Sequence, residues 1–156
     1  KPETTIVDIN EVASGALDLL SAQFRSHGLT LDTELGEALP PVRVNRYSLE
    51  EAVLNLVINA RDAVEHAQGD TRRVVLRTRA VDSWVVLEVE DEGCGIPEDL
   101  QGRIFEPFFT KEPDKGTGLG LSISRAIVES FDGTLDIASQ PAIETCAAIR
   151  LPTAAK

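Results

Sequence analysis

Three stretches of the sequence carry polar side chains or glycines that could bind a ligand. In the first, Asn55, Asn59 and Asp62 stand at helical spacing. Residues four and seven positions apart lie on one face of an α-helix. Because their neighbours in the sequence are apolar, we expect these three side chains to be half-buried. Buried amides need hydrogen-bond partners, which either a ligand or nearby loops can supply. Both interpretations are open for this stretch alone.

The second stretch, residues 91–97, follows a predicted strand and contains Asp91, Gly93 and Gly95. Glycine has no Cβ, so it adopts torsions that other residues avoid and lets a ligand approach the main chain. The Asp91 carboxylate can accept hydrogen bonds from an amine. A simple turn is the plainer interpretation of this stretch when it is taken by itself.

The third stretch, residues 115–122, is rich in glycine and leads into a helical pattern. The N-terminus of a helix presents unpaired N–H groups and a positive dipole, which suit phosphate. The stretch lacks the GxxxxGK[ST] pattern of a P-loop. It also lacks the βαβ context and the acidic residue of a dinucleotide-binding motif. Alone, this glycine pattern is a weak indication.

The spacing of apolar residues predicts the elements that position these stretches. Asn10 is predicted to cap the first helix and Gly28 to end it. The chain from Phe105 to Gly120 has no clear period, so it is predicted to be a long loop, and such loops are usually functional. The predicted helices cover residues 11–26, 48–66 and 119–131, and the predicted strands cover 4–8, 29–33, 42–44, 73–79, 84–90, 134–138 and 145–151.

These elements alternate, although not as a strict βαβαβ series. We therefore predict a single domain over residues 1–156, with a two-layer α/β sandwich and a mixed sheet. The strands at 73–79 and 84–90 are predicted to form a hairpin.

Composition excludes several classes of protein. The formal net charge of −11 argues against a nucleic-acid partner, which would require clustered Lys and Arg. No apolar run is long enough to cross a bilayer, so we expect no direct membrane contact by this domain. Cys94 and Cys146 are far apart without CxxC spacing, which favours a reduced, cytoplasmic setting. The absence of methionine indicates a piece of a longer protein.

Taken together, these stretches resemble the motifs of the histidine-kinase catalytic domain, within the gyrase, Hsp90, histidine-kinase and MutL superfamily. The N, G1, F and G2 boxes of that domain are matched by residues 49–60, 91–96, 104–110 and 116–122. Four motifs in the right order are much more specific than any one of them. The resemblance covers residues 5–152 and implies the Bergerat fold, in which a mixed sheet packs on about three helices.

The resemblance also implies roles for individual residues. Asn59 would hold Mg²⁺ through its side-chain oxygen, and Asn55 would support the phosphates or the waters of the metal. Asp91 would accept the adenine amino group of ATP, while Gly93 and Gly95 would make room for the base. Guanine presents a carbonyl at that place, so GTP should bind poorly.

A lid over residues 105–117 would cover the nucleotide, and Lys111 and Lys115 could neutralise phosphate charge. Backbone N–H groups of the glycine-rich stretch would reach the phosphates. Asn55 and Asn59 are the implied catalytic residues. The residues implied to bind nucleotide are Asn55, Asn59, Asp62, Asp91, Gly93, Gly95, Ile96, Phe105, Lys111, Lys115, Gly116, Thr117, Gly118, Leu119, Gly120 and Leu121.

Asn55 also bears on the type of reaction. The superfamily's ATPases carry a glutamate one turn before the metal-binding asparagine, where it activates water. An amide cannot act as a general base, so we expect slow hydrolysis and transfer to an imidazole supplied by another domain. The implied function is that of a sensor histidine kinase, with a histidine-bearing dimerisation domain of the same protein and a response-regulator receiver domain as partners. His27 and His66 lack the His-Glu context of the phosphoacceptor helix and are expected to be structural or exposed.

Three departures from the family pattern keep alternatives open. Asp62 stands where many members have a lysine or histidine, and Asp132–Gly133 replaces a double glycine. Residues 142–145 have lost the glycines of a terminal motif. The alternatives are a nucleotide-binding signalling module without efficient kinase activity and an ATPase of the superfamily. A purely structural domain would leave the glycine clusters and the loop unexplained.

Overall fold

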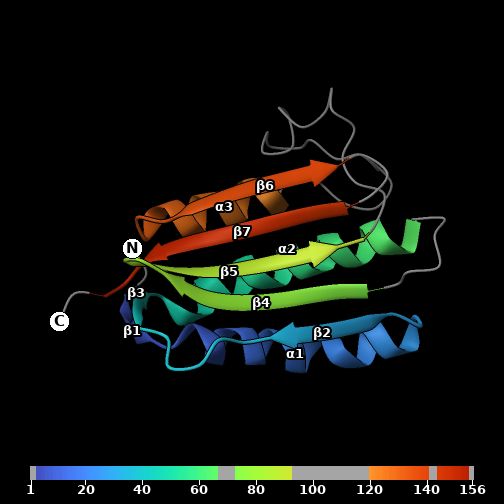
Figure 1. Ribbon diagram of the computed structural model, residues 1–156, viewed down its shortest axis with the longest axis horizontal. Coiled ribbons are helices and arrows are strands. Elements are labelled where there is room, and N and C mark those ends of the chain that lie inside the picture. Colours follow the sequence, from blue (N-terminus) through green and yellow to red (C-terminus); the bar gives the residue numbers. More distant parts are fainter. Residues whose placement is uncertain (1–2, 67–72, 93–119, 141–143, 155–156) are drawn as a thin grey trace.

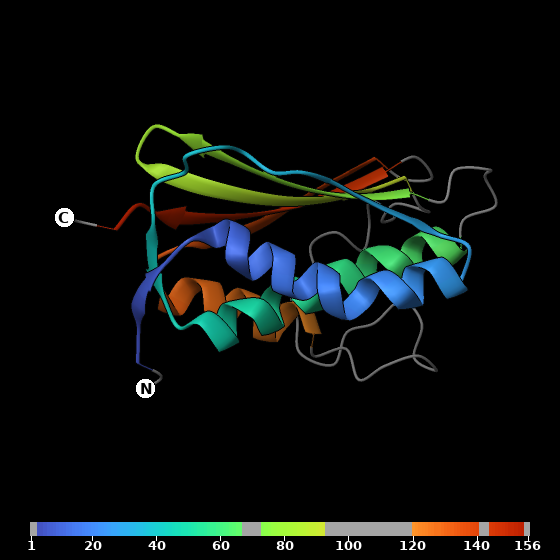
Figure 2. The same ribbon diagram turned by 90° about the horizontal axis from the view of Figure 1, so that it is seen from below.

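The computed structural model places three helices on one side of a five-stranded sheet (Figures 1 and 2). The structure describes residues 3–66, 73–92, 120–140 and 144–154. Its elements in chain order are β1 (Thr5–Val7), α1 (Ile9–Ser26), β2 (Thr30–Glu34), β3 (Val42–Val44), α2 (Arg46–His66), β4 (Arg73–Val81), β5 (Trp84–Asp91), α3 (Gly120–Ser130), β6 (Thr134–Gln140) and β7 (Glu144–Pro152). This arrangement confirms the predicted two-layer α/β sandwich.

The large sheet has the strand order β2-β4-β5-β7-β6. The β2 and β4 strands pair in parallel, with Leu31 opposite Val74, and the other three pairs are antiparallel. The sheet is therefore mixed, as predicted. Strands β1 and β3 form a separate antiparallel pair.

The core lies between the sheet and the helices because both present one apolar face. Alternate residues of β5 point to opposite faces of the sheet. Val85, Leu87 and Val89 are buried on the helix side. On the other side, Glu90 accepts a hydrogen bond of 3.1 Å from Arg77 on β4.

The predicted apolar stripe of α2 is confirmed: its residues Leu49, Val53, Leu56, Val57, Ala60 and Val64 are all at most 4% exposed. Burying a side chain of this size contributes about 1.5–3 kcal/mol relative to leaving it in water. The stripe therefore holds α2 against the sheet and leaves its opposite face for polar residues.

The start of α1 differs from the sequence prediction. Asp8 is the N-cap, and its carboxylate accepts a 2.9 Å hydrogen bond from the backbone N–H of Asn10. The helix begins at Ile9, so Asn10 already lies in its first turn. The Asn10 side chain instead donates to Gly36 O at 2.8 Å and accepts from Thr78 Oγ1 at 2.6 Å. These tertiary partners explain why Asn10 does not act as the cap.

The hairpin prediction is confirmed, with Val81 opposite Trp84 across a two-residue turn. Asp82 in that turn has φ 55°, a left-handed conformation that aspartate tolerates better than most residues. Helix α3 begins at Gly120 among the described residues. Within the described ranges, no helix combines the length and apolar character needed to cross a membrane.

Candidate nucleotide-binding site

Helix α2 carries Asn55, Asn59 and Asp62 on its polar side. Asn55 and Asp62 are half-buried, as expected, whereas Asn59 is exposed. Because the opposite stripe of the helix is buried under the sheet, the backbone that carries these side chains is held firmly. The three side chains therefore project from a rigid support.

The start of α3 lies against Asn55. The Asn55 side-chain Nδ2 donates to Ser124 Oγ at 3.3 Å, and Ser124 Oγ in turn donates to the backbone oxygen of Ala52 at 3.4 Å. A Cβ added at Gly120 would meet Asn55 Cγ at 4.0 Å, an ordinary contact distance. The structure thus brings together Asn55 and Gly120, two predicted site residues that are far apart in the sequence, and Leu121 follows half-buried in α3.

Asp91 is the last residue of β5 and is only 4% exposed. Its backbone stands opposite Val74 on β4 and Thr145 on β7. Within the described part of the chain it is the only buried carboxylate. Burying a carboxylate costs free energy unless hydrogen bonds replace those that it made with water. A buried carboxylate is therefore typical of a residue that has a role in function or in the structure.

The end of β5 and the carboxyl-terminal half of α2 lie at the same end of the molecule in both views (Figures 1 and 2). Helix α3 runs alongside only the earlier part of α2, and α2 continues past its start. Strand β5 and helix α2 are in contact. Asp91 and the polar side of α2 are thus carried by adjoining elements.

An arginine that the sequence analysis did not single out stands beside Asp62. Arg61 Nη2 lies 3.4 Å from Asp62 Oδ1, and Arg61 Nη1 donates to Gln23 Oε1 on α1 at 2.6 Å. Arg61 therefore offsets the negative charge of Asp62, and it also lies 3.9 Å from Glu65 Oε1. Adjacent residues of a helix do not normally face each other, so the sequence did not indicate this pair.

His27 lies 2.7 Å from Glu65 Oε1, and its side chain is 48% exposed. This agrees with the expected structural or exposed role. The side chain of His66 lies outside the described residues.

Cys146 on β7 carries a thiol of low reactivity. Burial and, after it, the nearby Glu88 carboxylate, 3.4 Å from Sγ, together raise the pKa of this thiol to about 12. The thiol therefore stays protonated at neutral pH and is a poor nucleophile.

Several predicted site residues lie outside the described residues, so their positions remain predictions. They are Gly93, Gly95, Ile96, Phe105, Lys111, Lys115, Gly116, Thr117, Gly118 and Leu119. The same holds for Cys94 and for most of the predicted loop over residues 105–120.

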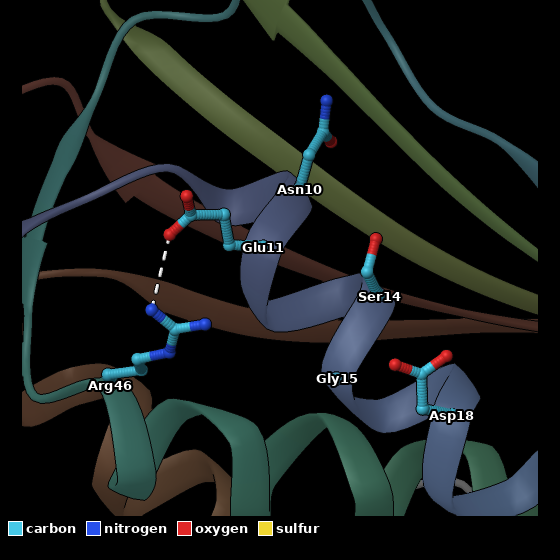
Figure 3. Close-up of a pocket in the computed structure, with 6 residues that line it drawn as sticks. All are labelled: Asn10, Glu11, Ser14, Gly15, Asp18 and Arg46. Atoms are coloured by element: carbon cyan, nitrogen blue, oxygen red, sulfur yellow. Dashed lines mark hydrogen bonds and ion pairs between the residues drawn. The ribbon is translucent and has the colours of Figure 1, made fainter.

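A separate hollow of about 450 Å³ lies between α1 and the start of α2 (Figure 3). Glu11 and Arg46 form an ion pair of 3.2 Å across it, and Asp18 lines it as well. Because Arg46 offsets Glu11 while Asp18 adds a negative charge, the hollow offers a triphosphate no net positive charge. None of the predicted site residues lines this hollow.

Comparisons with known proteins agree with this fold. The family described as "Histidine kinase-, DNA gyrase B-, and HSP90-like ATPase" matches residues 45–155. The chain is 42% identical over 145 residues to the two-component sensor PprA of Pseudomonas aeruginosa, which covers 90% of this chain and 16% of that protein. It is 35% identical to the sensor kinase CckA of Brucella abortus, covering 97% of this chain and 17% of that protein.

Among solved structures, the catalytic domain of histidine kinase ThkA superposes with a TM-score of 0.84 at 28% identity, covering 97% of this chain and 98% of that one. The chain therefore belongs to the histidine kinase-, DNA gyrase B- and HSP90-like ATPase family, as the sequence motifs indicated. It spans about a sixth of the length of the curated relatives PprA and CckA.

Proposed function

We propose that this chain is the ATP-binding catalytic domain of a sensor histidine kinase. It transfers the γ-phosphate of ATP to a histidine on a dimerisation domain of the same protein, from which a response-regulator aspartate accepts it. The observation that carries the proposal is the family match together with Asn55 at the position of the ATPase glutamate. The domain works in the cytoplasm, where ATP is available, whether or not the parent protein is anchored in a membrane.

The arrangement of the described residues supports a nucleotide that extends from Asp91 to the polar side of α2. The buried Asp91 carboxylate is an acceptor for the adenine amino group. The start of α3 beside Asn55 supplies backbone N–H groups and a positive dipole for the phosphates. The acidic net charge of −11 makes such a local source of positive potential necessary.

The oxygen ligands on α2 also fit magnesium. Asn59 is exposed on the same helix as Asp62 and offers an amide oxygen, a ligand type that this hard cation accepts. No group of three His, Cys, Asp or Glu side chains gathers in the described residues to form a complete protein cage. Magnesium typically binds through one or two protein ligands plus substrate phosphates, so it would enter with ATP. Bound there, it would neutralise charge that develops on the transferred phosphoryl group.

Asn55 favours transfer to a histidine over hydrolysis. Its amide has no basic site near neutral pH, and its Nδ2 already donates to Ser124. A water molecule next to the γ-phosphate would therefore lack a general base at this position. The proposal consequently assigns to Asn55 the positioning of phosphate or metal-bound water.

Calorimetry with a non-hydrolysable ATP analogue tests the binding site. We expect Asn59→Ala to weaken binding at least about tenfold in magnesium and to change it little in EDTA, because the lost ligand acts only on the metal. Glu51→Ala, an exposed change two turns earlier on α2, is the matched control and should leave both affinities unchanged. Equal affinities of wild type and Asn59→Ala in magnesium would refute the metal assignment.

Labelled ATP tests the reaction. Mixed with a separate dimerisation domain that carries the phosphoacceptor histidine, the chain should transfer phosphate, and a His→Ala version of that domain should remain unlabelled. Without the domain, turnover of ATP should be slow. Fast turnover without an acceptor would support the ATPase alternative, and binding without transfer would support a signalling module that has no kinase activity.

A further inference from the structure

A short chain of hydrogen bonds links α3 to the polar side of α2. Ser124 is fully buried at 0% exposure, and its hydroxyl lies between the backbone oxygen of Ala52 and the side-chain nitrogen of Asn55. No motif of the sequence analysis involves Ser124. A buried hydroxyl requires partners, and here both partners belong to α2.

In the structure, the NH₂ end of the Asn55 amide faces Ser124, and the Ser124 hydroxyl donates to Ala52. A serine hydroxyl has one hydrogen, and the Ala52 carbonyl can only accept it. The remaining lone pairs of Ser124 Oγ can only accept, so they require the NH₂ end of Asn55. The Asn55 Oδ1 is thereby turned to the other edge of the amide plane, away from Ser124.

We propose that Ser124 is a positioning residue that fixes the Asn55 amide with its oxygen available to the magnesium-bound waters. This inference rests on the proposed function. A free amide can rotate by 180° and present its NH₂ group instead. This group carries hydrogens with partial positive charge, so it would repel the cation and the outward-pointing hydrogens of the waters bound to it. The hydrogen bond to Ser124 prevents that rotated orientation before the nucleotide arrives. The amide is therefore already in the binding orientation, and no free energy of binding is needed to select it.

The geometry further ties nucleotide binding to the packing of α3. Ser124 lies one turn after Gly120, the first described residue of α3. The first N–H groups of a helix have no acceptor within the helix itself. The same helix thus supplies the dipole for the phosphates and the acceptor that orients Asn55. A merely structural serine would stabilise the contact between α2 and α3 without affecting the affinity for nucleotide.

Calorimetry with a magnesium-bound ATP analogue separates these roles. We expect Ser124→Ala to weaken binding about 3- to 10-fold, the range of one neutral hydrogen bond. Val128→Ala is the matched control, because Val128 is also 0% exposed on α3 and leaves the hydrogen bonds of Asn55 intact. It should lower stability to urea and leave the affinity unchanged.

A double-mutant cycle identifies the route of the effect. If Ser124 acts through Asn55, Ser124→Ala should cause no further loss of affinity in an Asn55→Ala background. An equal loss in both backgrounds, or no loss in either, overturns the proposal. A wild-type chain that fails to bind the analogue refutes the proposed function itself, whereas binding with an unaffected Ser124→Ala refutes only this inference.

Hydrogen exchange of the Asn55 side-chain amide tests the proposal in the wild-type chain, so the result does not depend on whether a variant folds. In spectra of chain labelled with ¹⁵N-asparagine, the side-chain protons of Asn55 should exchange with solvent more slowly than those of exposed Asn59. Exchange of the Asn55 protons as fast as those of Asn59 would show that the bond to Ser124 does not hold the amide, and would overturn the proposal.

Discussion

Replacing Asp91 by asparagine exchanges a buried carboxylate for an amide of nearly the same shape. The Asp91 side chain is only 4% exposed, so water screens its carboxylate little. The hydrogen bond that it accepts from the adenine amino group should therefore have the full strength of a bond to a charged group. Such a bond contributes about 1.5–3 kcal/mol, which corresponds to about 10- to 150-fold in affinity. We therefore expect Asp91→Asn to weaken ATP binding by that factor.

The same change should alter the choice of base. An asparagine can turn its NH₂ group towards the guanine carbonyl, which the carboxylate cannot do. The affinity for GTP should therefore stay constant or rise, and the ratio of ATP to GTP affinity should fall at least about tenfold.

The assay is competition of ATP and GTP against a fluorescent nucleotide, with circular dichroism to establish that the variant is folded. Asp136→Asn on β6 is the matched control, because Asp136 is an exposed strand aspartate and its change should leave both affinities unaltered. A folded Asp91→Asn variant with the wild-type ratio of affinities would refute the reasoning that Asp91 reads the adenine amino group.

Three further predictions concern the turn between α3 and β6 and the last strand, β7. Gly133→Ala should lower the free energy of unfolding by about 1–3 kcal/mol in urea titrations, because its Cβ would clash with the backbone oxygen of Arg150; an unchanged midpoint would contradict this. Asp132→Gly should raise the same quantity by up to about 1 kcal/mol, since Asp132 has φ 62° and glycine adopts that conformation without strain; a loss of stability would count against it. In a Cys94→Ala background, Cys146 should react slowly with a thiol reagent at pH 8, because a pKa of about 12 leaves roughly a thousandfold less thiolate than an ordinary cysteine has. Glu88→Gln should speed the reaction of Cys146 with the reagent, and a reaction as fast as that of free cysteine would refute the assignment. Because the pKa of Cys146 is raised in the folded protein, the stability that this thiol contributes is present below about pH 8.5 and is lost as the pH rises towards 12.

The sequence alone determined those features that depend on local pattern. The buried stripe of α2 followed from apolar residues at helical spacing, and the β4–β5 hairpin followed from two alternating runs around a short turn. The order and spacing of the four motifs indicated the family, which the family match over residues 45–155 confirmed. These features are readable because each is set by residues close together in the chain.

Tertiary structure alone decided the contacts between distant residues. Asn10 was expected to cap α1, but its side chain bonds to Thr78, 68 residues away, and Asp8 became the cap. The bond from Asn55 to Ser124 joins residues 69 apart, and no local pattern marks Ser124. A side chain's partner depends on which elements the fold brings together, and propensity or periodicity within one element carries no record of it.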